Sequence, residues 1–280
     1  MKRLRLQSAK IFSMNLPNGA SRLANIRLHP IKSLDPVAVR EARIGPGGGL
    51  EFDRAWALYS ADGQWVNGKR TAAVHLIRAA FAPDVSSVTL SVPGDRHKIP
   101  TKTFSFPRDT EAASKWFSNF FEQPITVRHS PEGFPDDTVA NGPTIVSTTT
   151  LQAVCDLFDG MDLDEARRRF RTTLEIEGVP AFWEDQLFGE EERSAVRFCI
   201  GQVNFEGSNP CARCPVPPRD PRTGEIIPGF QKIFSDYRRS HIPPWTPEAR
   251  FDHYYRLSTN TRVASSEAGN VLRVGDALLL

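Results

Sequence analysis

Short segments in which apolar and polar side chains alternate dominate the first half of the chain, and turn-forming residues close each one. A period of two is typical of strands that bury one face of a sheet. Glycine and proline interrupt this alternation most densely at residues 45–49 (GPGGG), where a strand cannot continue. This half is therefore predicted to be mostly β. The expected strands cover residues 24–29, 37–44, 54–60, 74–81, 88–92 and 102–106.

Four helices are expected between and after these strands. The first begins at Asp109 or Thr110 and runs up to Pro124, with aromatic side chains at helical spacing. Ser147 is expected to cap the second helix, which Gly160 closes. The remaining helices are predicted at residues 162–169, where acids precede bases as the helix dipole favours, and around 230–237. Further strands are predicted at residues 171–177, 195–204 and 271–280.

A turn-rich stretch at residues 131–142 (PEGFPDDTVANG) has little periodicity, which predicts a long loop between two parts. We expect a flexible basic tail at residues 1–22, an N-terminal domain at 23–125 and a second domain at 126–280. The fold class is predicted to be α+β, mostly β with flanking helices. Because the first 34 residues contain no acid, the start is interpreted as a loose tail, an over-extended start before Met14 or an organelle-targeting segment.

The overall charge and the cysteine content exclude several classes of protein. Lys and Arg number 35 against 33 Asp and Glu, and this net charge of +2 is too even to indicate nucleic acid or an anionic membrane as the partner. No run of about 18 apolar residues occurs, so no transmembrane segment is expected. Four cysteines in 280 residues do not make a disulfide framework, which predicts a reducing compartment, the cytoplasm.

Cys211 and Cys214 form a C-A-R-C motif in a segment rich in proline, so both thiols are expected in a loop. The neighbouring Arg213 would lower a thiol pKa and favour the thiolate, the form that binds metals. Soft thiolates suit a soft or highly charged metal centre. A structural zinc site is an alternative, but it needs four ligands and no second C-x-x-C exists. A thioredoxin-like pair is a further alternative that the prolines at 215, 217 and 218 disfavour.

Basic residues next to predicted strands are candidates for holding an anion. Lys32 and Ser33 follow the first strand, and Arg54 starts another after Asp53. Lysine supplies a mobile charge and arginine a fork of donors, which are the groups that hold phosphate. Arg169 and Arg171 are predicted to share one face of an incipient strand with Phe170 on the other. Each of these residues is also typical of a solvated surface, so only their combination favours an anion site.

Five motifs in order resemble the family of MOSC proteins that carry an amino-terminal MOSC barrel, which includes the mitochondrial amidoxime-reducing component and bacterial relatives. The match extends from residue 25 to residue 280. The motifs are P-I-K-S at residues 30–33, F-D-R-A-W-A-L at 52–58, R-F-R-T-T-L at 169–174, C-A-R-C with R-D-P-R-T-G-E within 211–225, and V-G-D at 274–276.

The resemblance implies two β-barrel-like parts with a molybdenum cofactor, Mo-molybdopterin, between them. On the family pattern Cys214 is the metal ligand and the catalytic residue, whereas Cys211 is a neighbour without that role. The cofactor contacts carried over are Lys32, Ser33, Arg54 and Arg171, together with two positions where the sequence departs from the pattern. Thr173 replaces an asparagine, and Asn141 stands where relatives have a Ser-Pro pair.

The activity that the resemblance implies is reduction of small N-hydroxylated compounds. Because no ferredoxin-like domain follows Leu280, the electrons are expected from a separate donor protein of the ferredoxin, flavin or cytochrome type. The alternative is a molybdenum cofactor carrier or sulfur-transfer module, since MOSC domains also occur in molybdenum cofactor sulfurases. Those sulfurases carry a desulfurase domain that binds pyridoxal phosphate, so this cofactor is associated with the family. This sequence contains no such domain.

Overall fold

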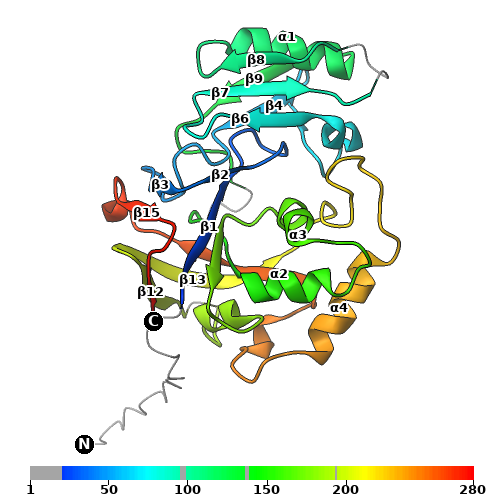
Figure 1. Cartoon of the computed structure of the whole chain (residues 1–280). Helices are drawn as coiled ribbons and strands as arrows, with labels where there is room; N and C mark the ends of the chain where they lie inside the picture. Colours follow the sequence, from blue (N-terminus) through cyan, green and yellow to red (C-terminus); the bar gives the residue numbers. More distant parts are fainter. Residues whose placement is uncertain (1–20, 95–98, 136–138, 193) are drawn as a thin grey trace, which may run out of the picture.

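A computed structural model describes residues 21–94, 99–135, 139–192 and 194–280. Most of the predicted tail, residues 1–20, lies outside the described residues. Figure 1 shows two regions, a smaller one with α1 on its outer side and a larger one with α2, α3 and α4. The prediction of a mostly β chain with flanking helices is confirmed for the described residues.

The larger region is built on an eight-stranded sheet whose strands come from both ends of the chain. Neighbours pair antiparallel except β10 and β11, which are parallel. The order is β16 (Leu278–Leu279), β12 (Val196–Ile200), β13 (Val203–Ala212), β14 (Arg256–Arg262), β10 (Ile145–Ser147), β11 (Leu174–Glu177), β1 (Arg22–Leu28) and β2 (Val37–Val39). The first two strands thus share a sheet with the second half, and the predicted division at 125/126 stays a prediction.

The smaller region contains two three-stranded antiparallel sheets, the α-helix α1 and a short 3-10 helix. Helix α1 (Thr110–Phe121) buries Trp116, Phe117 and Phe120 against this region, which explains the aromatic spacing of its sequence. One sheet has the order β5 (Trp65–Val66), β4 (Trp56–Ser60), β9 (Ile125–His129), and the other β6 (Arg78–Phe81), β7 (Ser87–Ser91), β8 (Lys102–Ser105). A separate pair joins β3 (Glu41–Arg43) to β15 (Val271–Arg273).

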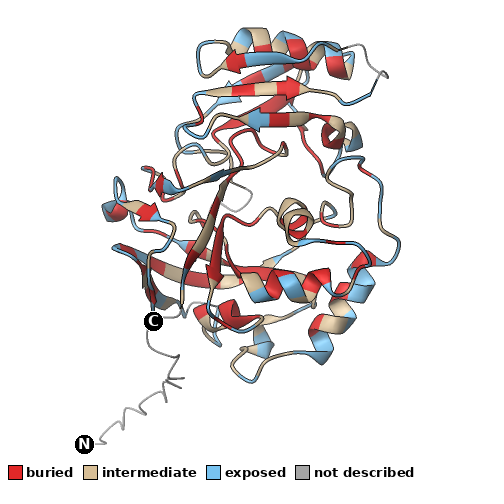
Figure 2. Ribbon diagram, in the orientation of Figure 1, coloured by how far each residue is buried: buried red, intermediate tan, exposed pale blue. Residues whose placement is uncertain are grey.

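Three helices pack on the large sheet through a second apolar cluster. They are α2 (Thr148–Cys155), α3 (Leu163–Phe170) and α4 (Phe230–Ser240). The predicted cap Ser147 accepts a hydrogen bond from the Thr150 amide at 3.1 Å, although α2 ends at Cys155, before Gly160. Figure 2 shows buried residues concentrated in the strands and on the inner sides of these helices. The cluster joins Val146 of β10 to Leu151, Phe170, Phe230 and Phe234.

Several predicted strands are shorter than expected or replaced. Residues 37–44 form two strands, β2 and β3, and the start of 74–81 is the 3-10 helix η1 (Ala72–Leu76). The predicted strand at 171–177 is wrong in its first part, because α3 continues to Phe170 and Arg171 ends it in a left-handed conformation. Arg169 and Phe170 are therefore helical, and β11 begins only at Leu174. Further 3-10 helices are η2 (Trp183–Leu187), η3 (Glu248–Arg250) and η4 (Ser265–Glu267).

Strand β14 lies inside the large sheet, between β13 and β10, and its sequence RLSTNTR gave no strand prediction. Thr259 and Thr261 are fully buried there. Their hydroxyls donate to main-chain carbonyls, Thr259 to Glu184 at 2.6 Å and Thr261 to Pro143 at 2.7 Å. Two of the buried positions are thus filled by hydroxyl groups whose hydrogen bonds are satisfied, which removes the apolar alternation that predicts a strand.

A buried ionic cluster lies beneath the same sheet. Arg238 of α4 pairs with Asp185 of η2, and Thr246 donates to Asp185 at 2.7 Å. The neighbouring Glu184 is buried and accepts from Thr150 at 3.1 Å. Burial, with the charge of Asp185 second, raises the pKa of Glu184 to about 7. Its ionised form is therefore unfavourable in the folded state.

Among the described residues, no helix combines the length and the apolar character that crossing a membrane requires.

We predict that Glu184→Gln stabilises the protein at alkaline pH. Between the ordinary carboxyl pKa of 4.5 and about 7 the folded state keeps a proton that the unfolded state has lost, so the free energy of unfolding falls as pH rises through this window. The full effect is about 3 kcal/mol at pH 8. Urea unfolding at pH 4.5 and pH 8 measures it. The exposed Glu190→Gln is the control, and equal slopes in Glu184→Gln and the natural protein would contradict the assignment.

Candidate functional site

A cavity of about 420 Å³ lies between the two regions, and residues from both line it. Every residue singled out from the sequence as a site residue is on its wall: Lys32, Ser33, Arg54, Asn141, Arg171, Thr173 and Cys214. Segments that are far apart in the sequence, residues 32–54 and 209–217, therefore face one space. What the residues do there follows from their individual contacts.

Lys32 follows the end of β1, and the structure fixes its side chain closely. Its amide donates to the carbonyl of Trp56 at 2.8 Å, which ties the turn to the start of β4. The ammonium group donates to the carbonyl of Phe134 at 2.9 Å and lies 3.9 Å from the centre of the Trp65 ring. The carbonyl and the ring face orient the ammonium group at the cavity wall.

Arg54 is held by a buried carboxylate. Asp53 pairs with the Arg54 guanidinium and accepts from the His29 amide at 2.7 Å. Burial alone would raise the pKa of Asp53, but Arg54 and the hydrogen bond from His29 lower it to about 2. Burial, with the Arg171 charge second, lowers the pKa of His29 to about 3. Asp53 is therefore ionised and His29 neutral across the physiological range.

Arg171 turns into the cavity at the point where α3 ends. Its guanidinium donates to the carbonyl of Leu34 at 2.7 Å, and its own carbonyl accepts from Arg54 at 3.3 Å. Two residues further on, Thr173 is tied to β1, because its carbonyl accepts from the Arg27 amide at 2.8 Å. The Thr173 hydroxyl is buried and finds no hydrogen-bond partner among the described residues. A donor-acceptor group is thus left over on the cavity wall.

Three of these residues have left-handed backbone conformations. The φ angles are 75° at Ser33, 54° at Arg54 and 51° at Arg171. Residues with a side chain rarely adopt this region, and such positions are enriched at functional sites. The residue types alone did not predict this feature. It turns all three chain segments sharply at the cavity wall.

The two cysteines lie at different places than expected. Strand β13 extends to Ala212, so the prediction that both thiols lie in a loop is wrong for Cys211, and only Cys214 lies beyond the strand. The Arg213 guanidinium donates to the Cys211 sulfur at 3.1 Å and to the carbonyl of Phe170. Arg213 therefore contacts the thiol of Cys211. Both cysteines line the cavity, and both are free thiols.

Asn141 lies on the cavity wall with its side-chain amide engaged by the protein. It donates to the carbonyl of Gly47 at 2.7 Å and accepts from the Val263 amide at 3.3 Å. Gly48, with φ of 83°, packs against it so closely that a Cβ there would lie 2.4 Å from the amide nitrogen. In this structure Asn141 holds the glycine-rich turn of residues 45–49 in place.

Sequence reasoning missed several wall residues. Asn67, Lys69 and His75 come from the segment between β5 and β6, which contains no recognisable anion-binding motif. Proximity in the folded chain is the only signal that identifies them. Among the described wall residues the basic side chains are Lys32, Arg54, Lys69, Arg169, Arg171 and Arg213, and the acidic ones are Asp53 and Glu132. This excess of positive charge favours an anionic ligand.

A closed zinc site receives no support from the described part of the chain. No group of three or more histidine, cysteine, aspartate or glutamate side chains there is arranged to hold a metal ion. A structural zinc site needs four ligands, and the described residues bring no third or fourth one to the two cavity cysteines.

Known proteins with similar sequences are of two kinds. The molybdenum cofactor sulfurase of Caenorhabditis elegans is 23% identical over 241 residues, 80% of this chain and 33% of that protein. The sulfurase of Caenorhabditis briggsae is 31% identical over 288 residues, 96% of this chain and 37% of that protein. The mitochondrial amidoxime-reducing component 1 of Danio rerio is 27% identical over 236 residues, 72% of this chain and 70% of that protein.

The chain thus spans about a third of the length of these two sulfurases. Residues 20–124 match the family described as the MOSC N-terminal beta barrel domain. This match agrees with the barrel that the sequence motifs implied for the first part of the chain. Together with the two kinds of relatives, it identifies the chain as a MOSC-domain protein with an N-terminal MOSC beta barrel domain.

Proposed function

We propose that the protein holds a molybdenum cofactor in the cavity and uses it to reduce small N-hydroxylated compounds. One observation carries the proposal. The thiol of Cys214 shares a cavity of about 420 Å³ with Lys32, Arg54 and Arg171, which come from both regions of the fold. A soft metal ligand and a set of phosphate-binding cations are the two features that a metal-bearing pterin phosphate requires.

The residues present fit such a group. The basic side chains on the wall outnumber the acidic ones, which suits a phosphate. The buried Thr173 hydroxyl has no partner among the described residues, so it is available to the ligand in place of the asparagine of related sequences. A pterin dithiolene brings its own metal ligands, which agrees with a cavity where the described side chains offer no closed metal site.

Each residue has a separate task in this proposal. Cys214 supplies the protein ligand to the metal, and Lys32, Arg54 and Arg171 hold the phosphate. Asp53 keeps Arg54 in place, and its depressed pKa keeps this ion pair intact down to about pH 2. The bound cofactor supplies two-electron redox chemistry. The protein contributes binding, orientation and the positive field of the cavity.

Reducing an N-hydroxylated compound to the amine consumes two electrons and two protons and releases water. We propose that a separate protein of the ferredoxin, flavin or cytochrome type delivers the electrons. The four free cysteines fit a reducing compartment, and the cytoplasm is our proposal for the location. Similarity to a protein named as a mitochondrial amidoxime-reducing component supports the substrate class and makes an organelle the alternative location.

A second candidate function is carrying the cofactor or transferring sulfur to it. It is favoured by the similarity to molybdenum cofactor sulfurases, which extends over 96% of this chain in one case. It is favoured also by the second thiol in the cavity, Cys211, to which Arg213 donates a hydrogen bond at 3.1 Å. A sulfur carrier needs an accessible nucleophilic thiol near the cofactor, and Cys211 is partly exposed on the cavity wall.

We predict that Cys214→Ala abolishes benzamidoxime reduction by metal-loaded protein with an artificial electron donor. Cys211→Ala is the matched control, because it removes the other thiol of the same motif and should retain most of the activity. Molybdenum and zinc are measured in the same samples. Protein that carries zinc and no molybdenum would overturn both candidate functions.

A different pattern would decide for the second candidate. If loaded protein reduces no N-hydroxylated compound but passes its cofactor to an apo-enzyme, the carrier function holds and the reductase is excluded. If sulfur transfer occurs and Cys211→Ala stops it, the sulfur-transfer module is correct. Equal loss of reduction in both cysteine variants would contradict the separate roles given to the two thiols.

We predict that Arg171→Met lowers cofactor retention about tenfold, because a charge-assisted hydrogen bond contributes about 1.5–3 kcal/mol. The difference from the natural protein should shrink in added salt, because salt also screens the attraction between Arg171 and the phosphate. Molybdenum per protein after dialysis at low and at high ionic strength measures it. Arg197→Met, which removes an arginine 85% exposed on β12, is the control and should change neither value. Retention unaffected by Arg171→Met would exclude a phosphate contact at this residue.

A further inference from the structure

The segment after Cys214 forms a compact loop with hydrogen bonds of its own. We call residues 214–227 the Cys214 loop. The Arg219 amide donates to Val216, the Gly224 amide to Asp220 and the Ile227 amide to Pro218, each at 2.9 Å. The loop is therefore a preformed unit, and moving one end of it moves the other. Its place relative to the cavity depends on what holds it from outside.

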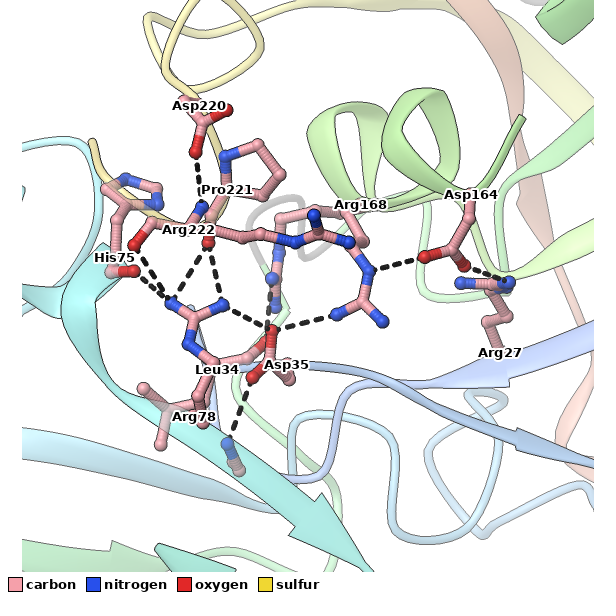
Figure 3. A network of polar contacts seen from close by, with 12 residues as sticks. Arg27, Leu34, Asp35, His75, Arg78, Asp164, Arg168, Asp220, Pro221 and Arg222 are labelled. Carbon is pink, nitrogen blue, oxygen red and sulfur yellow. Dashed lines mark hydrogen bonds and ion pairs between the residues drawn. The ribbon is translucent and has the colours of Figure 1, made fainter. Parts of the chain in front are cut away.

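Two arginines hold the loop by its main-chain carbonyls, one from each region. Arg169 of α3 donates to the carbonyl of Pro217 at 3.0 Å. Arg78, the first residue of β6, donates to the carbonyl of Pro221 at 3.1 and 3.2 Å and to that of Arg222 at 3.5 Å. Figure 3 shows the Arg78 guanidinium directed at these carbonyls from the side of the smaller region. The loop is thus held from outside at two places, Pro217 and the Pro221–Arg222 segment.

Asp35 connects Arg78 to helix α3, whose end lies at the cavity wall (Figure 3). Its carboxylate accepts from Arg78 at 3.5 Å, from Arg168 at 3.1 Å and from the Ala79 amide at 3.0 Å. Arg168 in turn donates to Asp164 at 2.7 Å. The Asp35 side chain is 14% exposed and that of Arg78 22%, so these pairs are less screened than surface ion pairs.

The members of this network lie next to cavity residues in the sequence. Asp35 follows Ser33 by two positions, Arg168 precedes Arg171 by three, and the loop begins at Cys214. The network therefore links three segments that line the cavity. Its charged members Asp35, Arg78 and Arg168 are not themselves among the lining residues. A small displacement of one segment would be transmitted to the others through charged hydrogen bonds, which are stronger than neutral ones.

We propose that Arg78 is a positioning residue for the Cys214 thiol, holding the Cys214 loop in register with the phosphate-binding segments. The cofactor part of this inference rests on the proposed function, whereas the part that concerns how Arg78 holds the loop does not. Arg78 is well suited to the task because its planar guanidinium donates in several directions at once. It reaches the loop, Asp35 and the carbonyl of His75 together.

The test uses Arg78→Met in the full chain, which keeps the aliphatic length and removes every donor. Hydrogen exchange of the cofactor-free protein over residues 219–227 should become about tenfold faster. Losing one hydrogen bond from a charged group is enough for a change of this size in the opening equilibrium of the loop. Molybdenum retained by the loaded protein after dialysis should fall about tenfold as well, because retention depends on the thiol in its place. Arg222→Met is the matched control, since it removes an exposed arginine from the same loop and leaves its carbonyl.

The outcomes separate this inference from the proposed function. Faster exchange with unchanged molybdenum retention overturns the positioning role and leaves the proposed function intact. Unchanged exchange would contradict the claim that Arg78 holds the Cys214 loop in place. If the natural protein retains no molybdenum, the proposed function fails, and the cofactor role of Arg78 fails with it, whatever the exchange shows.

A conservative variant guards against a general loss of stability. Arg78→Lys keeps the charge beside Asp35 but has donors for fewer carbonyls, so exchange and retention should both lie between those of Arg78→Met and the natural protein. If Arg78→Met does not fold, Arg78→Lys decides alone. A parallel change in both measurements supports the inference, and a change in only one overturns it.

Discussion

Mutual repulsion among the basic side chains of one cavity is the constraint on which the structure depends. Lys32, Arg54 and Arg171 share an enclosed space with other cations, and like charges that are partly buried repel each other more strongly than in water. Main-chain carbonyls of Phe134 and Leu34 hold two of these cations. These hydrogen bonds fix where the two cations lie on the cavity wall, so that they stay apart from each other. Basic side chains still outnumber acidic ones among the described wall residues, which favours an anionic ligand.

The backbone geometry serves the same end. Ser33, Arg54 and Arg171 adopt left-handed conformations that are unfavourable for residues with side chains, so surrounding contacts have to hold them. Those contacts are short main-chain bonds between segments, such as Lys32 to Trp56 and Arg54 to His29. Where main-chain bonds end, the Asp35 network and its arginines continue the linkage. Free energy of folding is thus used to hold the cavity wall in one arrangement.

The sequence predicts those parts of the fold that repeat a simple pattern. The amphipathic helix around Trp116 is found where expected, because its apolar spacing reflects the buried face directly. The strand around Trp56 is also found where expected, although it is buried on both faces. Strand β14 could not be predicted, since Thr259 and Thr261 occupy buried positions where apolar side chains would be expected, and their hydroxyls find partners only in the folded chain. The end of the helix at Arg171 could not be predicted for a related reason. The sequence of residues 169–171 is compatible with a helix and with a strand, and packing in the folded chain decides between the two.

The candidate site was predictable where ordered motifs carried the information. Cys214 and Arg171 were identified from such motifs, and both line the cavity. His75 and Arg78 lie in a segment without a motif, so only the fold reveals one on the cavity wall and the other at the Cys214 loop. The partner of Arg213 was also beyond the sequence, because spacing alone does not tell which of two thiols a guanidinium contacts.

The bond between the Cys214 sulfur and a metal is the central claim, and X-ray absorption at the molybdenum edge of loaded protein tests it most directly. The account predicts one sulfur ligand beyond those of the pterin dithiolene, present in the natural protein and in Cys211→Ser but missing in Cys214→Ser. A sulfur shell that is the same in all three proteins would contradict it.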